Sequence, residues 1–378
     1  MSRKIAIIGG GVIGLSTAWE LACRGHRVLL FEKSKVGRKA SWAGAGILAP
    51  ANSSTATQPL DKLLGLGSDL HESWSEKLLQ QSGIDNGFWK CGGLYVARTA
   101  GEHATLMGQT QYWNEYDIEF EVVDKSDLDI ERGVCLDAAK TVIHVPGEAQ
   151  ICNPDHLSAL ELACRRNEVK VLEQVKELNI AFANGGLINL RCDKGNYEFD
   201  QICLCAGAWT MGILQSLGVR IPQIPVRGQM LLFESQVKLS KIINEGSRYI
   251  VPRQDGHVLV GSTTEEVGFD EGTTEEKTEE LLDLASAWVP ELSRETLRKN
   301  WAGLRPATHD GFPYMGELQE LSGVFISTGH FKSGLQMSPA AAVMVADLMD
   351  EKETLLDPAA FHPSRLNVKE NLTMSNHI

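Results

Sequence analysis

The sequence predicts a mixed α/β fold in which a parallel-sheet domain is interleaved with a second domain built on an antiparallel sheet. Three observations predict it. The chain has 378 residues, a length that favours two domains or one large α/β unit. A strand–helix–strand unit of about thirty residues opens it, and strand-like alternation dominates residues 225–233 and 248–261. No low-complexity linker separates the two kinds of segment, so the domains are expected to interleave.

The opening unit consists of two apolar strands around one helix. Residues 5–8 form a short β-branched run typical of a buried parallel strand, residues 12–24 a helix that ends near Gly25, and residues 27–31 a second strand. Two basic residues before the first run give it a superficial likeness to a signal peptide. Glycines end the run at once and no small-residue cleavage site follows, so a first strand is the better interpretation.

The rest of the chain alternates between helical and strand-like patterns. Helices are expected at residues 69–82, 100–116, 155–166, 274–288 and 339–349. Strands are expected at residues 170–178, 201–204 and 324–327, besides the two alternating regions. The tail after Pro363 is polar, and we expect it to be loose.

Composition excludes several classes of function. A formal net charge of −13 argues against a nucleic-acid partner. The eight cysteines include no C-x-x-C pair, so neither a metal site nor a dithiol site is expected. We expect buried free thiols in a reducing, cytoplasmic compartment. No run of about 18 apolar residues occurs, so no membrane span is expected.

Residues 9–14 read GGGVIG and fit the pattern G-x-G-x-x-G. Gly9 allows a tight turn, Gly11 lets the backbone approach a pyrophosphate at the helix N-terminus, and Gly14 lets the helix pack closely on the strand. Glu32 ends the second strand, where a carboxylate can accept hydrogen bonds from a ribose hydroxyl. The spacing predicts a Rossmann-type dinucleotide site rather than an unliganded turn, but it does not distinguish FAD from NAD.

Residues 40–50 form a run of small side chains soon after Glu32. Such a run can let the backbone pass close to a large flat cofactor, although a flexible loop is the alternative.

The sequence resembles the D-amino acid oxidase family of FAD-dependent oxidoreductases, in particular its glycine oxidase branch. The resemblance covers nearly the whole chain and rests on residues 9–14 with Glu32, 40–50, 301–316 and 327–334. Sarcosine oxidases and D-amino acid dehydrogenases are close relatives. The resemblance implies an FAD-binding domain of residues 1–50, 150–222 and 300–378, interleaved with a substrate-binding domain of residues 51–149 and 223–299.

The resemblance also implies a noncovalent FAD site, because no cysteine lies near residues 327–339, unlike in sarcosine oxidases with covalent flavin. Val175 resembles the residue whose backbone meets the adenine. We expect Ser338 to cap a helix that has Pro339 in its first turn, and amides there to stabilise negative charge on the reduced flavin. The implied FAD-site residues are Gly9, Gly11, Val12, Ile13, Gly14, Glu32, Lys33, Ala40, Ser41, Gly46, Ile47, Leu48, Val175, Ala206, Gly207, Trp209, Arg305, Gly329, His330, Phe331, Lys332, Ser333, Gly334, Leu335 and Gln336.

Three residues are the candidates for substrate binding and catalysis: Arg305, Tyr249 and Lys332. A guanidinium matches a carboxylate with two parallel hydrogen bonds, and Arg305 lies at the family's carboxylate-binding position. Tyr249 resembles the tyrosine that contacts the bound amino acid. Lys332 stands where glycine oxidases usually have arginine, and residues 335–339 are more polar than the usual aliphatic run. These two departures bear on the substrate more than on the cofactor.

The implied reaction is oxidative deamination of glycine, sarcosine or a D-amino acid. Hydride leaves the α-carbon for flavin N5, the imine hydrolyses to an oxo acid, and O2 is reduced to H2O2. A dehydrogenase that passes electrons to a quinone and a flavoprotein subunit that needs a partner are the alternatives. An NAD-dependent dehydrogenase leaves residues 40–50 and 329–334 unexplained. A role in thiamine synthesis follows from the family alone, and a homo-oligomer is left open.

Overall fold

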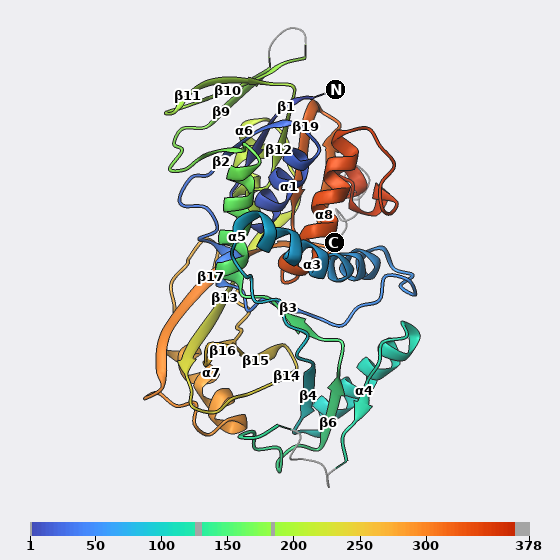
Figure 1. Ribbon diagram of the computed structural model, residues 1–378, viewed down its shortest axis with the longest axis vertical. Coiled ribbons are helices and arrows are strands. Elements are labelled where there is room, and N and C mark those ends of the chain that lie inside the picture. Colours follow the sequence, from blue (N-terminus) through green and yellow to red (C-terminus); the bar gives the residue numbers. More distant parts are fainter. Residues whose placement is uncertain (1, 125–130, 183–185, 367–378) are drawn as a thin grey trace, which may run out of the picture.

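The computed structural model describes residues 2–124, 131–182 and 186–366, and two sheets dominate it (Figure 1). The first sheet has six strands in the order β18-β19-β12-β1-β2-β8. Its strands are β1 (Lys4–Ile8), β2 (Arg27–Phe31), β8 (Lys170–Leu172), β12 (Gln201–Leu204), β18 (Tyr314–Leu318) and β19 (Leu321–Thr328). All neighbours pair in parallel except β18 with β19.

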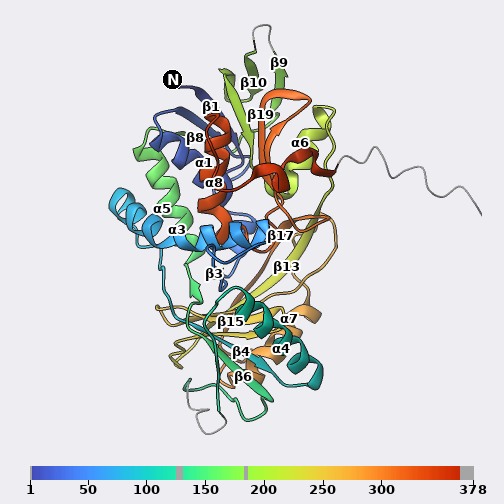
Figure 2. The same ribbon diagram turned by 90° about the vertical axis from the view of Figure 1, so that its right-hand side faces the viewer.

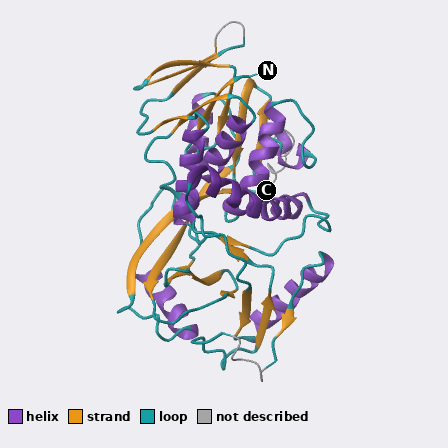
Figure 3. Ribbon diagram, in the orientation of Figure 1, coloured by secondary structure: helices purple, strands orange, loops and turns teal. Residues whose placement is uncertain are grey.

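The central strand β1 is apolar on both faces because both faces of the sheet are covered. Ile5 and Ile7 lie in one core with the helices, whereas Ala6 and Ile8 lie in the core on the opposite face. This double burial explains why the strand reads as a continuous apolar run. The helices on the first face are α1 (Val12–Cys23), α3 (Pro59–Ser82), α5 (Asn153–Arg166) and α8 (Gly334–Met349) (Figure 3).

A smaller three-stranded sheet and one short helix cover the second face. The strands are β9 (Asn179–Phe182), β10 (Ile188–Cys192) and β11 (Gly195–Phe199), and the helix is α6 (Thr210–Ser216). Strands β9 and β10 lie at the upper end of the molecule in Figure 2, and α6 lies below them. Phe199 and Leu190 face the core that Ala6 and Ile8 share.

The second large sheet has eight strands in the order β17-β13-β16-β15-β14-β4-β6-β5. They are β4 (Gly93–Ala97), β5 (Glu121–Val122), β6 (Thr141–Val145), β13 (Gln223–Glu234), β14 (Ile242–Glu245), β15 (Arg248–Pro252), β16 (His257–Gly261) and β17 (Leu297–Thr308). Neighbours are antiparallel except β14 with β4. Helix α7 (Glu275–Trp288) packs on this sheet, and α4 (Ala100–Glu115) packs on β4.

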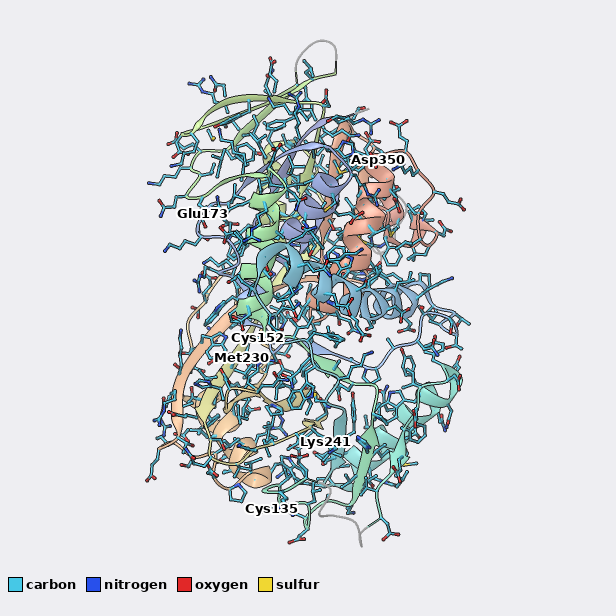
Figure 4. All side chains as sticks on the ribbon, in the orientation of Figure 1. Cys135, Cys152, Glu173, Met230, Lys241 and Asp350 are labelled. Carbon is cyan, nitrogen blue, oxygen red and sulfur yellow. The ribbon has the colours of Figure 1, made fainter. Side chains whose placement is uncertain are left out.

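The long strands β13 and β17 pair along most of their length and pass from one half of the molecule to the other (Figure 1). Met230, labelled in Figure 4, lies on β13 within the second sheet. Short elements complete the fold: α2 (Ala40–Ala43), β3 (Ile47–Leu48), β7 (Ala149–Gln150) and the 3-10 turns η2 (Gly207–Trp209), η3 (Pro358–Phe361) and η4 (Pro363–Leu366). The predicted fold class, a Rossmann-type sheet joined to a mostly antiparallel one, is confirmed.

Helix α3 starts ten residues before its predicted position at Asp69, and it packs in the core of the first sheet with α1 and α8. Its first half contains two glycines, Gly65 and Gly67, which have a low helix propensity. They serve close approach instead, since a Cβ on Gly67 would lie 2.2 Å from the Gln336 carbonyl oxygen. Residues 59–82 therefore do not pack where the predicted domain division assigns them.

Other expectations need smaller corrections. Strand β17 contains residues 300–308, which were assigned to the first domain but pair in the second sheet. The strand expected at 170–178 ends at Leu172. The loose tail is wrong for residues 364–366, because Arg365 binds the Asp310 carboxylate at 2.8 and 3.0 Å. Residues 367–378 lie outside the described residues.

The cysteines follow the expectation only in part. Cys164, Cys203 and Cys205 are buried free thiols, but Cys23 and Cys135 are exposed. Among the described residues, every helix is too short or too polar to cross a membrane.

Candidate active site

A cavity of about 930 Å³ lies at the carboxyl ends of the parallel strands, where the two sheets meet. Open parallel sheets bind their ligands at this edge. Of the residues that the sequence singled out, the following line the cavity: Gly9, Gly11, Val12, Ile13, Glu32, Lys33, Ala40, Ser41, Gly46, Ile47, Val175, Ala206, Gly207, Trp209, Tyr249, Arg305, His330, Phe331, Lys332, Gly334 and Leu335. Segments separated by hundreds of residues thus share one space.

Five expected residues do not line the cavity: Gly14, Leu48, Gly329, Ser333 and Gln336. They lie behind its walls. A Cβ on Gly14 would stand 1.9 Å from the Gly9 carbonyl oxygen, so this glycine is needed for the packing of α1 on the loop. Ser333 and Gln336 face a second cavity of about 580 Å³.

The glycine loop presents backbone groups to the cavity. Gly9 has a φ of +112°, a conformation that suits glycine, and α1 begins at Val12. The Val12 amide donates to Ser41 Oγ at 2.9 Å, so a side chain from the 40–50 segment caps the first turn. The exposed N-terminus of α1 gives the cavity a positive dipole end that suits a phosphate.

Glu32 is held close to the glycine loop. Its carboxylate accepts from the Gly10 amide at 2.8 Å and from the Ser34 amide at 2.7 Å. Oε1 also accepts from Ser34 Oγ at 2.9 Å, so Oε2 is the oxygen that retains a lone pair for a hydroxyl donor. The Val175 amide donates to the Glu32 carbonyl at 2.9 Å, so of the Val175 backbone only its carbonyl is left to meet an adenine.

Helix α8 corrects the expected start at Pro339. It begins at Gly334, and Pro339 lies inside it. Proline has no amide hydrogen, so it cannot bond the Leu335 carbonyl four residues earlier. Ser338 Oγ donates to that carbonyl at 2.8 Å, and His71 Nε2 lies 3.0 Å from it. The helix therefore starts beside the cavity, one turn earlier than predicted.

His330 is only 4% exposed and lines the cavity, yet neither ring nitrogen has a hydrogen-bond partner among the described residues. Burial lowers the pKa of His330 to about 3, so the ring is neutral at physiological pH. A buried polar group without a partner is costly. A ligand with hydrogen-bonding groups would satisfy it.

Arg305 extends from β17 into the end of the cavity nearest the second sheet. Its guanidinium donates to the Thr263 carbonyl at 3.1 Å and to Ser262 Oγ at 2.8 Å, and it lies against Gly228. No acidic side chain among the described residues forms an ion pair with Arg305 or Lys332. Burial, and then the nearby Arg305 charge, lower the pKa of Lys332.

Tyr249 lies on β15 and lines the same space as Arg305 and Lys332. Its hydroxyl has only a weak contact, 3.6 Å to Met230 Sδ. Such a group is free to bond a ligand.

Several lining or supporting residues escaped the sequence prediction. Asn153 donates to the Ser41 carbonyl at 2.7 Å, and its own Oδ1 is buried without a partner among the described residues. Arg253 fixes the Ala45 carbonyl at 2.7 Å. Lys39 and Glu271 form an ion pair of 2.6 Å at the cavity wall. Among these residues, Asn153 alone could have been found from the sequence, because it is a polar residue at the start of a helix. The positions of the others in the site depend on tertiary contacts.

Comparisons with known proteins agree with this geometry. A family model described as FAD dependent oxidoreductase (DAO) matches residues 4–348. A glycine oxidase of Pseudomonas aeruginosa is 33% identical over 371 residues, covering 96% of this chain and 99% of the relative. The bifunctional protein ThiO/ThiG of Trichormus variabilis is 28% identical over 386 residues, covering 99% of this chain and 56% of the relative.

The crystal structure of glycine oxidase from Geobacillus kaustophilus superposes with a TM-score of 0.88 at 30% identity, covering 100% of this chain and 99% of that one. The resemblance stated from the motifs is confirmed, and with it FAD as the cofactor. The chain belongs to the DAO family of FAD-dependent oxidoreductases.

Proposed function

We propose that this FAD-dependent amine oxidoreductase oxidises a small amino acid, glycine, sarcosine or a D-amino acid, to an imine that hydrolyses in water. The observation that carries the proposal is the pair of cations at one end of the cavity. Arg305 and Lys332 form no ion pair with an acidic side chain among the described residues, although they line the same cavity. A substrate carboxylate would satisfy both of them.

The walls fit the cofactor. The dipole at the N-terminus of α1 suits the diphosphate, and Glu32 suits a ribose hydroxyl. The unpartnered atoms of His330 and Asn153 can form hydrogen bonds with polar groups of the cofactor. Bound FAD supplies the hydride acceptor. We assign the FAD site to the predicted residues that line the cavity, and a supporting role to the five that lie behind it.

The chain's own contribution is positioning. The Arg305 fork, fixed by Thr263 and Ser262, would hold the substrate carboxylate in one orientation, and Lys332 would add a second, point-like charge. Tyr249 would close the pocket with its hydroxyl toward the carboxylate. Orientation and exclusion of water are the main sources of acceleration when a cofactor carries the chemistry.

We further propose that residues 1–50, 150–222 and 300–378 serve the cofactor and residues 51–149 and 223–299 serve the substrate. The strand composition of the two sheets supports most of this division. Helix α3 and residues 300–308 are the exceptions described above.

The electron acceptor, pathway and compartment are part of the proposal. O2 is the acceptor that the name glycine oxidase implies for the relatives, and the ThiO/ThiG relative favours a role in thiamine synthesis. We propose a cytoplasmic location, based on a composition that favours reduced thiols. A D-amino acid dehydrogenase and a subunit that requires a partner are the alternatives.

Anaerobic mixing of the holoenzyme with glycine, sarcosine and D-amino acids tests the proposal. Bleaching of the flavin absorbance by at least one of them is expected, followed on aeration by reoxidation and one peroxide per turnover. Bleaching without peroxide would favour the dehydrogenase. No bleaching by any amine would overturn the proposal and favour a subunit that needs its partner.

A further inference from the structure

Residues 47–50 lie between two cavities. Ile47 lines the large cavity, whereas Ala49 and Pro50 line the second cavity of about 580 Å³. Leu48 is buried, but Ala49 is exposed, so side-chain packing does little to fix the backbone of Ala49. The β3–β7 ladder also ends at Leu48, which pairs with Ala149.

Gln336 holds this segment instead. Its Nε2 donates to the Ala49 carbonyl at 2.9 Å, and its Oε1 accepts from the Ala49 amide at 3.3 Å. One buried side chain thus satisfies both backbone groups of one residue, as a neighbouring strand would. Nε2 also donates to Ser68 Oγ on α3 at 2.9 Å. Gln336 is 3% exposed, so its side-chain amide depends on these protein groups for hydrogen bonds.

Gln336 is itself fixed in place. It belongs to the first turn of α8, directly after the 329–334 loop that carries Lys332. His71 Nε2 lies 3.2 Å from the Gln336 carbonyl and 3.0 Å from the Leu335 carbonyl. The side chain therefore ties the Ile47 wall to the Lys332 loop across the end of the cavity.

We propose that Gln336 is a positioning residue that sets the separation of the Ile47 wall from the Lys332 loop and thereby the size of amine that the site accepts. The inference rests on the proposed function and deepens it. The family resemblance leaves the polar character of residues 335–339 unexplained. The proposal explains it at Gln336, whose side-chain amide fixes a cavity wall that borders the second cavity on its other side.

The test is Gln336→Met in the holoenzyme, a swap that keeps side-chain length and removes both bonds to Ala49. With the segment free to move into the second cavity, kcat/KM for glycine is expected to fall about tenfold, since small displacements weaken positioning. The ratio of kcat/KM for D-alanine over glycine is expected to rise, and the visible circular dichroism of the bound flavin to change.

Ser68→Ala is the matched control, because it removes one hydrogen bond of the same amide and leaves both bonds to Ala49. Its substrate ratio and flavin spectrum are expected to stay at wild-type values. If Gln336→Met does not fold, Gln336→Glu takes its place, since it keeps the shape and loses the amide donor.

A variant with a lower melting temperature but an unchanged spectrum and substrate ratio would overturn the proposal and leave Gln336 a purely structural residue. If no amine reduces the flavin of the wild-type enzyme, the proposed function fails separately. The circular dichroism of the bound flavin then still decides whether Gln336 positions the Ile47 wall.

Discussion

The two ends of the cavity differ in what lines them: backbone groups at one end and side chains at the other. The end that we propose for the diphosphate is the backbone of one local stretch, residues 9–14, at the N-terminus of α1, with Glu32 close behind. The end that we propose for the substrate carboxylate consists of side chains, Arg305, Tyr249 and Lys332, from three separate segments. At the backbone end, the closest contacts leave no room for any side chain larger than glycine. At the side-chain end, one cationic residue can replace another, and Lys332 stands where the family resemblance leads us to expect arginine.

The halves also differ in how their buried groups titrate. Burial lowers the pKa of His71 to about 4 and that of His330 to about 3, both beside the first sheet. Beside the second sheet, burial raises the pKa of Glu148 to about 8, although its bonds to Asn244 on β14 and Tyr95 on β4 oppose the shift. The contribution of these buried groups to the free energy of unfolding therefore changes with pH in opposite directions in the two regions.

Gly14→Ala is the most severe way to break the backbone end. The new Cβ would stand 1.9 Å from the Gly9 carbonyl oxygen, so the loop cannot keep its shape. Loss of bound flavin, measured as absorbance per mole of purified protein, is expected. Gly101→Ala on α4 is the control, since nothing lies within 4 Å of its Cβ position; it should gain up to about 1 kcal/mol. Full flavin content in Gly14→Ala would show that the loop tolerates a side chain.

Arg305→Ala tests the side-chain end. Loss of the fork leaves the substrate carboxylate unpaired, and transition-state binding should weaken by roughly 3–5 kcal/mol in kcat/KM. Arg298→Ala is the control, because Arg298 lies on the same strand in an exposed pair with Glu234. A loss of less than tenfold in Arg305→Ala would remove this residue from carboxylate binding.

Glu148→Gln sharpens the pH contrast. Burial raises the folded-state pKa of Glu148 to about 8 from its ordinary value of 4.5, so the native state binds more protons than the unfolded state between those values. Stability contributed by this group is complete below pH 4.5 and falls as pH rises toward 8, by at most about 1.4 kcal/mol per pH unit. The buried histidines have lowered pKa values, so their contribution rises with pH up to about 6.5.

Melting temperatures across this range provide the measurement. Glu148→Gln should flatten the decline between pH 6.5 and 8, and the exposed-residue control Glu266→Gln should not. If the melting temperature of Glu148→Gln falls with pH as steeply as that of the wild type, Glu148 is not the cause of the decline.

Lys332→Arg is expected to have the smallest effect. Because burial and Arg305 lower the pKa of Lys332, its charge is lost at a lower pH than that of an ordinary lysine. Binding of acetate, followed by the flavin spectrum, should weaken as pH rises through that pKa. In Lys332→Arg the guanidinium stays charged and the weakening should disappear. Lys299→Arg, an exposed change on β17, should behave as wild type. A pH-independent wild type would exclude Lys332 from anion binding.

The sequence predicted features that depend on local contacts better than features that depend on contacts between distant residues. The strand, glycine loop, helix and Glu32 could be placed from spacing because their partners lie within thirty or so residues. Arg305, Tyr249 and Lys332 were placed through the family resemblance, and the structure brings them to one cavity. Whether they bind substrate stays a prediction.

The errors came from residues whose usual local meaning was overridden by a distant neighbour. Gly67 reads as a helix breaker, but it lets α3 approach the Gln336 backbone. Pro339 reads as a helix start, but His71 and Ser338 satisfy the carbonyl that it leaves free. Ser262, which fixes Arg305, carried no local signal at all.

The pairing of β1 has a consequence for how the protein is made. β1 is synthesised first, yet its neighbour β12 follows almost two hundred residues later, and β19 beyond that completes the floor of the site. The glycine loop therefore leaves the ribosome with its β2 neighbours, long before the Cys205 side of its packing exists. Flavin loading must wait for the last part of the chain, and a nascent polypeptide halted before Leu321 is expected to capture no FAD.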